Sequence, residues 1–191
     1  MRLAKEYCWK GLTTGANVVA IFLLLFLSTA LTPPQKKIAA AEHEVKAVYL
    51  FNFAQFVVWP SDVFESPASP IVIGILGKDP FGSYIEETVK DEIINGHSLV
   101  IQRYGSAKEI KNCHILFIHA SLTPRLDNIL NELKGKDILT VSDAKDFTKQ
   151  GGMVRFINER SKIKLEINLN TVKTTGITIS SKLLRLSEIV E

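Results

Sequence analysis

The chain has 191 residues, of which 46% are hydrophobic, and its 23 lysine and arginine residues against 20 aspartate and glutamate residues give a formal net charge of +3. Five of these basic residues and one acidic residue lie in the first 41 positions, so the rest of the chain carries 18 basic and 19 acidic residues. No basic cluster interleaved with aromatic residues remains to follow a phosphate backbone, which argues against nucleic-acid binding. The length after residue 41 suits one ordinary domain with a full core.

The first 41 residues have the pattern of an export signal. An apolar run from Ala16 to Leu31 follows three basic residues, Arg2, Lys5 and Lys10. The run is shorter than the roughly 20 apolar residues that cross a bilayer comfortably, and Ala39–Ala41 offers a cleavage site of small residues. We therefore expect a signal peptide over 1–41 and an exported domain over 42–191. An uncleaved amino-terminal anchor is the alternative, and both place the domain across a membrane.

The first element expected in the exported domain is a helix over Glu42–Trp59, because its apolar residues recur with a period near 3.6 and Pro60 ends it. Apolar runs then alternate with amphipathic stretches, which is typical of βα units in a mostly parallel sheet. The expected strands are Ile71–Leu76, Leu99–Tyr104, Cys113–Ile118 and Ile138–Val141. The expected helices are Phe81–Lys90, Ala107–Lys111, Pro124–Leu133 and a short one capped by Ser142 or Asp143 that ends near Lys149.

Beyond Gly152 the pattern changes to two alternating runs, Met153–Ile157 and Ile163–Asn168, which predict a hairpin. A last helix is expected over Ser180–Val190, where leucines and isoleucine lie on one side. The predicted fold is therefore α/β, a single domain with an open, mostly parallel, twisted sheet. Helices cover both faces of this sheet, and a C-terminal antiparallel β-hairpin lies at its edge.

Ligands of such sheets bind beyond the carboxyl ends of the strands. The candidate ligand-binding residues at these ends are Asp79, Phe81, Ser121, Ser142 and Asp143. The segment 78–82 could cradle a phosphate or carboxylate, because N–H groups at a helix start attract anions. The alternative is a plain turn between strand and helix, capped by Asp79. A small-molecule module for an anion or nucleotide-like ligand is therefore one functional hypothesis.

The residues that could carry catalysis or hold a cofactor form no recognised motif. His119, Ser121 and Asp143 could be imagined as a hydrolase site, but no serine lies in a G-x-S-x-G turn. The chain also lacks a dinucleotide-binding glycine motif and a P-loop. Cys113 is the only cysteine after residue 41, its neighbour His114 points to the opposite face of a strand, and the histidines are scattered. We expect no enzyme, no catalytic residue, no cofactor and no metal site.

The exported domain resembles the YfiR-like family of exported bacterial proteins. The resemblance spans most of the domain and depends on several short segments taken together in order. These are Lys46–Ala54 with Trp59-Pro60, Ile73–Gly77 with Asp79–Gly82, Cys113–Ile118, Leu139–Asp143, Phe147 with Gly151–Val154, Glu166–Asn168 and Ile179–Leu184.

The resemblance implies a periplasmic α/β protein, because its best-known relative represses a membrane-bound diguanylate cyclase by binding the cyclase's periplasmic portion. The expected partner is such a cyclase or a sensor kinase, the expected output is less cyclic-di-GMP and less biofilm, and the chain could form a homodimer. That relative is held by disulfides, whereas only Cys113 is present here, so a redox switch of the same kind is not expected. Aromatic residues dominate binding hot spots, which makes Tyr49, Phe53, Phe64 and Phe81 the candidate partner contacts.

Overall fold

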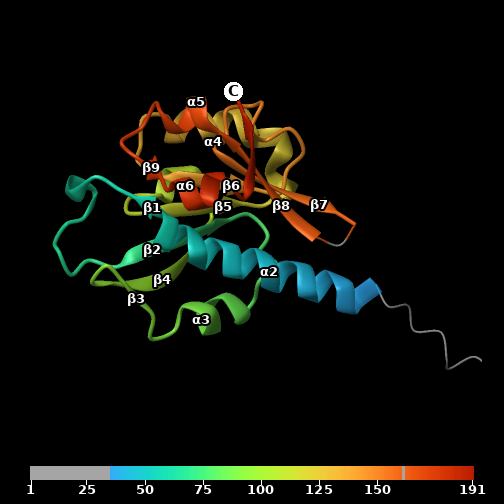
Figure 1. Ribbon diagram of the computed structural model, residues 1–191, viewed down its shortest axis with the longest axis horizontal. Coiled ribbons are helices and arrows are strands. Elements are labelled where there is room, and N and C mark those ends of the chain that lie inside the picture. The colour runs from blue at the N-terminus through green and yellow to red at the C-terminus, as the bar shows by residue number, and fades with distance from the viewer. Residues whose placement is uncertain (1–34, 161) are drawn as a thin grey trace, which may run out of the picture. The chain divides into compact units, whose positions relative to one another are not determined.

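The computed structural model describes residues 35–160 and 162–191 of the chain (Figure 1). The predicted signal peptide falls outside the described residues as far as residue 34, and its predicted end at residue 41 lies within the first described helix. None of the helices in these described ranges combines the length and the apolar character needed to cross a membrane.

An eight-stranded sheet forms the centre of the domain (Figure 1). Its strands are β2 Ile71–Leu76, β3 Ile93–Ile94, β4 His97–Tyr104, β5 Ile115–Ile118, β6 Leu139–Ser142, β7 Val154–Glu159, β8 Lys162–Asn168 and β10 Ser187–Val190. Their order across the sheet is β10-β8-β7-β6-β5-β2-β4-β3. The run from β4 to β7 is parallel, β3 and β8 pair antiparallel with β4 and β7, and β10 lies parallel to β8. The predicted α/β class, mostly parallel sheet and antiparallel C-terminal strand pair are confirmed.

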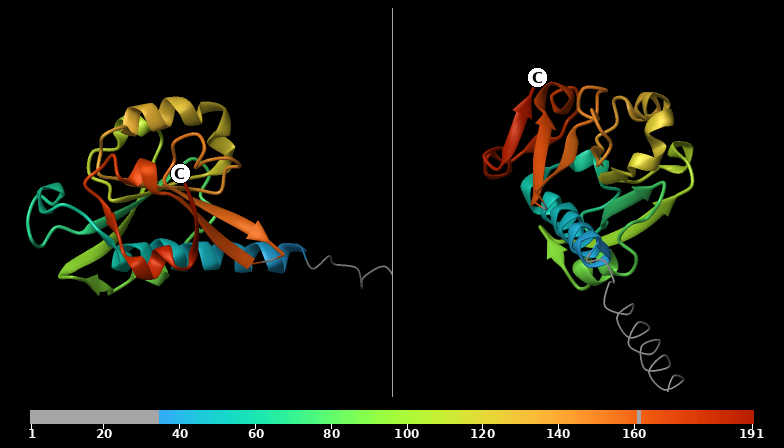
Figure 2. Two further views of the ribbon diagram at one scale, coloured as in Figure 1. Left: turned by 45° about the horizontal axis from the view of Figure 1, so that its top comes forward. Right: turned by 90° about the vertical axis from the view of Figure 1, so that its right-hand side faces the viewer.

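Helices cover both faces of the sheet. The α-helices are α2 Gln35–Phe56, α3 Tyr84–Val89, α4 Leu126–Leu133, α5 Leu169–Val172 and α6 Ser181–Leu184, and the 3₁₀ helices are η1 Ser61–Val63, η2 Ala107–Glu109 and η3 Ala120–Arg125. In the left view of Figure 2, α2 and α4 lie on opposite sides of the sheet. A separate antiparallel pair joins β1 Val57–Val58 to β9 Thr178–Ile179.

The core has two parts because the central strands are buried on both faces. Along β5, Ile115 and Phe117 belong to the cluster beneath α2 and α3, whereas Leu116 and Ile118 belong to the cluster beneath α4. Successive side chains of a strand point to opposite faces, so a strand covered on both sides becomes a continuous apolar run. This explains why β5 is a continuous run of hydrophobic residues.

The helix predicted over Glu42–Trp59 exists, but it begins by Gln35 and ends at Phe56. Its buried apolar residues, Ala47, Leu50, Phe53 and Ala54, recur at helical spacing, but Val45 and Val48 of the apolar period that predicted the helix are exposed. The next two residues form β1 instead of a last helical turn, because Val57 and Val58 pair with Ile179 and Thr178. Branched valines suit this extended pairing better than a helix end.

The short helix predicted between Ser142 and Lys149 is wrong, because the segment forms turns instead. The side chain of Asp143, expected to cap the helix, instead accepts a hydrogen bond from the backbone N–H of Ala120. Asp146 has a φ of +58°, a left-handed conformation that interrupts helical hydrogen bonding.

The C-terminal helix predicted over Ser180–Val190 is also wrong beyond its first turn. Helix α6 ends at Leu184, and β10 then extends the sheet beyond the hairpin by pairing with Leu165–Asn168 of β8. The Ser187 hydroxyl donates to the carbonyl oxygen of Leu183, which closes the short helix. Branched side chains at Ile189 and Val190 fit the strand that follows.

Three other predicted helices are shorter than expected or of another type. The predicted helix Phe81–Lys90 is α3, Tyr84–Val89, because Gly82 has a φ of +55° that no helix allows. The predicted helix Pro124–Leu133 begins at Leu126, after the 3₁₀ turns of η3. The segment predicted as a helix from Ala107 forms only the 3₁₀ turn η2. These changes leave the predicted order of strands and connecting segments intact.

Candidate functional site at the carboxyl ends of the strands

The strand order places a switch point at the carboxyl ends of β2 and β5. The chain leaves β2 for β4 on one side and later returns to β5 on the other. Such points leave room between diverging connections, and ligands of open α/β sheets bind there. Gly77 makes the first connection possible, since its φ of +94° suits glycine and an added Cβ would lie 2.9 Å from Leu122 Cδ1.

A buried lysine lies at the centre of this end of the sheet. Lys46, on α2, is only 3% exposed. Its Nζ lies 2.7 Å from Glu42 Oε1, one helical turn earlier, and 3.0 Å from Asp143 Oδ2, directly after β6. The other Asp143 oxygen accepts from the backbone N–H of Ala120 at 2.9 Å. One carboxylate therefore ties α2, β6 and the start of η3 together.

Two histidines border this ion pair. Burial lowers the pKa of His43, and the nearby charge of Lys46 lowers it further. Its Nδ1 is buried and has no hydrogen-bond partner among the described residues. His119, at the end of β5, accepts from the backbone N–H of Ser121 through Nδ1 at 3.0 Å. Together with Glu42, Lys46 and Asp143 these histidines form what we call the strand-end cluster.

The strand-end cluster uses its charged groups for structure. Lys46 has two carboxylate partners, and both oxygens of Asp143 are engaged. The hydrogen bond between Ser121 and His119 uses the serine backbone and not its hydroxyl, so it does not activate a nucleophile. This arrangement anchors α2 to the sheet; the hydrolase hypothesis receives no support from it.

The remaining candidate residues after β2 form a second, separate group. Asp79 Oδ1 accepts from the backbone N–H groups of Phe81 and Gly82, at 2.7 and 3.3 Å. Asp79 Oδ2 accepts from Arg103 Nε at 2.7 Å, and Arg103 also pairs with Glu86. The contacts with Glu86 and Asp79 raise the pKa of Arg103, and the hydrogen bond to Glu86 has the largest effect. The N–H groups predicted to cradle an anion thus bind the carboxylate of Asp79 itself, as the alternative interpretation proposed.

The other predicted ligand residues have different surroundings. Phe81 is 6% exposed and its ring lies 4.9 Å from that of Phe117, so it belongs to the core. Ser142 is fully buried, where its hydroxyl donates to the carbonyl of Ile118 and accepts from the N–H of Ala144. Ser121 is exposed on η3. Of the five candidates, Asp143 alone is a member of the strand-end cluster.

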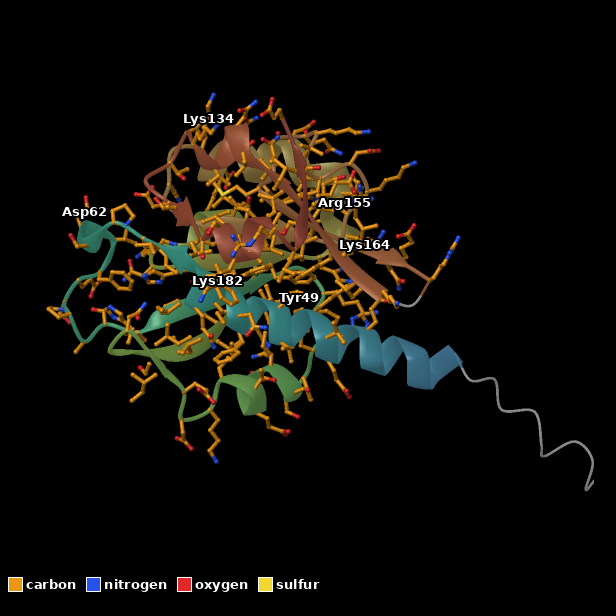
Figure 3. All side chains as sticks on the ribbon, viewed as in Figure 1. Tyr49, Asp62, Lys134, Arg155, Lys164 and Lys182 are labelled. Carbon is orange, nitrogen blue, oxygen red and sulfur yellow. The ribbon has the colours of Figure 1, made fainter. Side chains whose placement is uncertain are left out.

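The predicted partner contacts also differ in exposure. Phe53 is fully buried, which removes it from the surface, whereas Tyr49 and Phe64 are partly buried against the core. Tyr49 lies on α2 beside the β7–β8 pair (Figure 3), and its ring is 5.9 Å from that of Phe156.

Sequence reasoning missed Glu42, His43 and Lys46, although one signal was present. Lys46 precedes Leu50 and Phe53 by four and seven residues, the spacing of one helical face, and both of those residues are fully buried. A lysine on the buried stripe of a helix requires a buried partner. In residues 35–160 and 162–191, no three metal-ligating side chains gather in a way that could hold an ion.

A comparison with known protein families matches residues 43–188 to the YfiR/HmsC-like family. The chain belongs to this family. No curated protein matches the chain. Lys46 and Asp143, the ion pair that anchors α2, both lie within the matched range.

Proposed function

We propose that this protein is a periplasmic regulatory binding protein that modulates a membrane-bound signalling protein, namely a diguanylate cyclase. Membership of the YfiR/HmsC-like family over residues 43–188 is the observation that supports the proposal. The partner would be the periplasmic portion of the cyclase, and binding would lower cyclic-di-GMP.

Such a role needs binding energy and no catalytic group. A regulator shifts its partner between two states by as much as its affinities for those states differ. The ion pair of the strand-end cluster is compatible with this role, since Lys46 and Asp143 satisfy each other. Cys113 is 4% exposed and burial raises the pKa of its thiol to about 12, so it suits a structural role better than a redox switch.

The exposed side of α2 is the surface we propose for the partner. Val45 and Val48 are 44% and 39% exposed, and the partly buried ring of Tyr49 lies beside them in the helix. Apolar side chains that a core leaves at the surface gain free energy when a partner covers them. This surface includes Tyr49, one of the predicted partner contacts, and does not involve the buried Phe53.

The test of the proposal is genetic. The gene is deleted in its own host and cellular cyclic-di-GMP is measured, with and without a second deletion in each membrane-bound diguanylate cyclase. We expect cyclic-di-GMP to rise in the single deletion and to return to its original level when the partner cyclase is also absent. An unchanged nucleotide level in the single deletion contradicts the proposal.

The surface is tested by crosslinked capture of that cyclase from solubilised membranes. The double variant Val45→Lys/Val48→Lys should lose capture, because two charges replace apolar contacts. The matched control is Ile93→Lys, at a residue that is 69% exposed on the edge strand β3, and it should retain capture. Equal capture by both variants would move the partner away from α2.

A further inference from the structure

The outer edge of β4 lacks a strand partner along most of its length. Leu99–Tyr104 pair with β2 on one side of β4. On the other side, β3 pairs only with His97 and Ser98, and none of the described strands continues the sheet beyond that point. Alternate residues of Leu99–Tyr104 therefore present backbone N–H and C=O groups that no strand receives. An open edge of this kind can pair with another chain.

A groove of about 630 Å³ lies along this edge. Its lining comes from α3, from the turn that follows α3, from Ile93 of β3 and from residues 98–101 of β4. Leu99, Val100 and Ile101 all line it, although successive side chains of a strand point to opposite faces. The groove therefore includes the strand edge itself and is not only a hollow on one face. Apolar side chains border it at the surface, with Ile93 69% and Val100 39% exposed.

The two faces of the sheet beside this edge differ in chemistry. Leu99 belongs to the same core cluster as Val89 of α3, so α3 covers the face to which Leu99 points. The charged residues of the groove come from α3 and the turn after it, and they lie on this α3 face. Val100 points to the opposite face, where it exposes an apolar side chain.

The groove is acidic. Its charged lining residues are four acids, Glu86, Glu87, Asp91 and Glu92, against one base, Lys90. Glu86 pairs with Arg103, whereas the other three acids are exposed and form none of the ion pairs found among the described residues. Unpaired negative charge attracts a cationic partner and repels an anionic one.

A second copy of this chain fits the edge less well than a basic segment does. Pairing β4 with β4 of another copy would bring together two grooves that carry the same unpaired carboxylates. Like charges facing each other across paired strands are destabilising. Lysine or arginine side chains at the same place would instead gain free energy from these carboxylates.

We propose that the outer edge of β4 binds an extended, basic segment of a partner protein by strand addition. The backbone of the segment pairs with Leu99–Tyr104. Its lysine or arginine side chains lie on the α3 face, toward Glu87, Asp91 and Glu92, and the residues that alternate with them are apolar and lie beside Val100. This edge is separate from the α2 surface, and the proposal does not depend on regulation of a cyclase.

The probe is a short peptide of alternating lysine and valine with blocked ends, long enough to span Leu99–Tyr104. One comparator replaces lysine by glutamate, which reverses the charge. The other replaces alternate valines by proline, which retains the charge but removes backbone N–H donors and opposes strand pairing. Binding to the protein as its own host produces it is measured by fluorescence anisotropy of the labelled peptide. We expect saturable binding of the lysine–valine peptide and at least roughly tenfold weaker binding of both comparators.

Hydrogen exchange of the backbone amides locates the bound peptide. The peptide should slow exchange within Leu99–Tyr104. Exchange in β10, the strand at the other edge of the sheet, should stay unchanged and serves as the internal control.

Glu87→Lys/Glu92→Lys tests the charge of the groove at two exposed positions. The double variant should weaken binding of the lysine–valine peptide by at least about tenfold, because attraction becomes repulsion. The matched control is Glu132→Lys/Glu188→Lys, at exposed acids of α4 and β10, which changes the net charge by the same amount. It should leave binding unchanged to within about twofold, since these charges lie away from the groove.

Four results would each overturn the proposal. The first is no saturable binding of the lysine–valine peptide. The second is equal binding of the proline peptide, which would mean charge attraction without strand addition. The third is an equal loss in the two double variants, which would make net charge the cause. The fourth is a dimer in solution whose residues Leu99–Tyr104 exchange slowly without peptide, because a second copy would then occupy the edge.

Discussion

The buried ion pair at the carboxyl end of the sheet and the buried ring N–H groups at its amino end differ in whether they have partners. At the carboxyl end, Lys46 and Asp143 are buried or nearly so and engage each other and neighbouring groups. At the amino end, the side-chain N–H groups of Trp59 and His114 are buried without partners in the described part of the chain. Paired groups hold elements together, whereas a buried group without a partner costs free energy.

The largest expected effect comes from breaking the paired end. Lys46→Met should lower the free energy of unfolding by about 3 kcal/mol, because the substitution leaves the Asp143 carboxylate without its buried cation. Urea unfolding followed by circular dichroism measures this difference. Adding Asp143→Asn to Lys46→Met should recover part of the loss, since the uncompensated charge is then removed as well.

Lys149→Met is the control for this prediction. Lys149 Nζ lies 3.1 Å from Asp146 Oδ1, nearly the same distance as between Lys46 and Asp143, but the Lys149 side chain is 75% exposed. A solvated pair of this kind contributes little, so the stability should not change measurably. If Lys46→Met is as mild as Lys149→Met, the strand-end cluster does not anchor α2.

The second prediction concerns pH and the unpaired end. Burial, with a smaller contribution from the charge of His97, lowers the pKa of His114 to about 4 from 6.5. As pH falls, His114 therefore takes up a proton near pH 6.5 in the unfolded chain but only near pH 4 in the folded chain. The folded state is progressively destabilised as pH falls through this window. Between pH 7 and pH 5 the loss attributable to His114 is about 2 kcal/mol.

His114→Asn should remove this part of the pH dependence. The asparagine carbonyl can still accept from the backbone N–H of Val72, which His114 Nδ1 now does, but the side chain no longer titrates. The unfolding free energies of wild type and variant are measured at pH 7 and pH 5. The difference in stability between the two proteins should be smaller at pH 5 than at pH 7. Parallel profiles would mean that His114 titrates as an ordinary histidine.

The sequence predicted the structure of a segment where the segment's own residues and near neighbours determine it, and failed where distant parts of the fold decide. Strand β2 was predicted to the residue, because a parallel strand covered on both faces is a continuous apolar run between turn residues. The C-terminal helix failed after Leu184, since Ile189 and Val190 suit a helix face and a strand equally, and only the free edge of β8 decides between them.

The candidate site residues show the same difference between local and long-range interactions. The side chain of Asp79 caps its own turn, a local interaction that the sequence could suggest. Lys46 and Asp143 are separated by 97 positions in the chain, and nothing in either local pattern joins them. The Trp59 and His114 donors were equally out of reach, because an unpaired group is defined by everything that surrounds it in the fold.

The smallest expected effect compares a paired and an unpaired donor by the same kind of substitution. Tyr104→Phe removes a buried hydroxyl that lies 3.1 Å from Gln102 Oε1 and 3.2 Å from the carbonyl oxygen of Asn112, and it should cost about 1–2 kcal/mol. Trp59→Phe loses some buried ring but also removes an orphan N–H group, so the two terms offset and the cost should stay below about 1 kcal/mol. Thermal and urea unfolding of both variants measure the contrast. A cost for Trp59→Phe above that for Tyr104→Phe would show that the indole N–H is already satisfied, and the two ends of the sheet would then not differ in this respect.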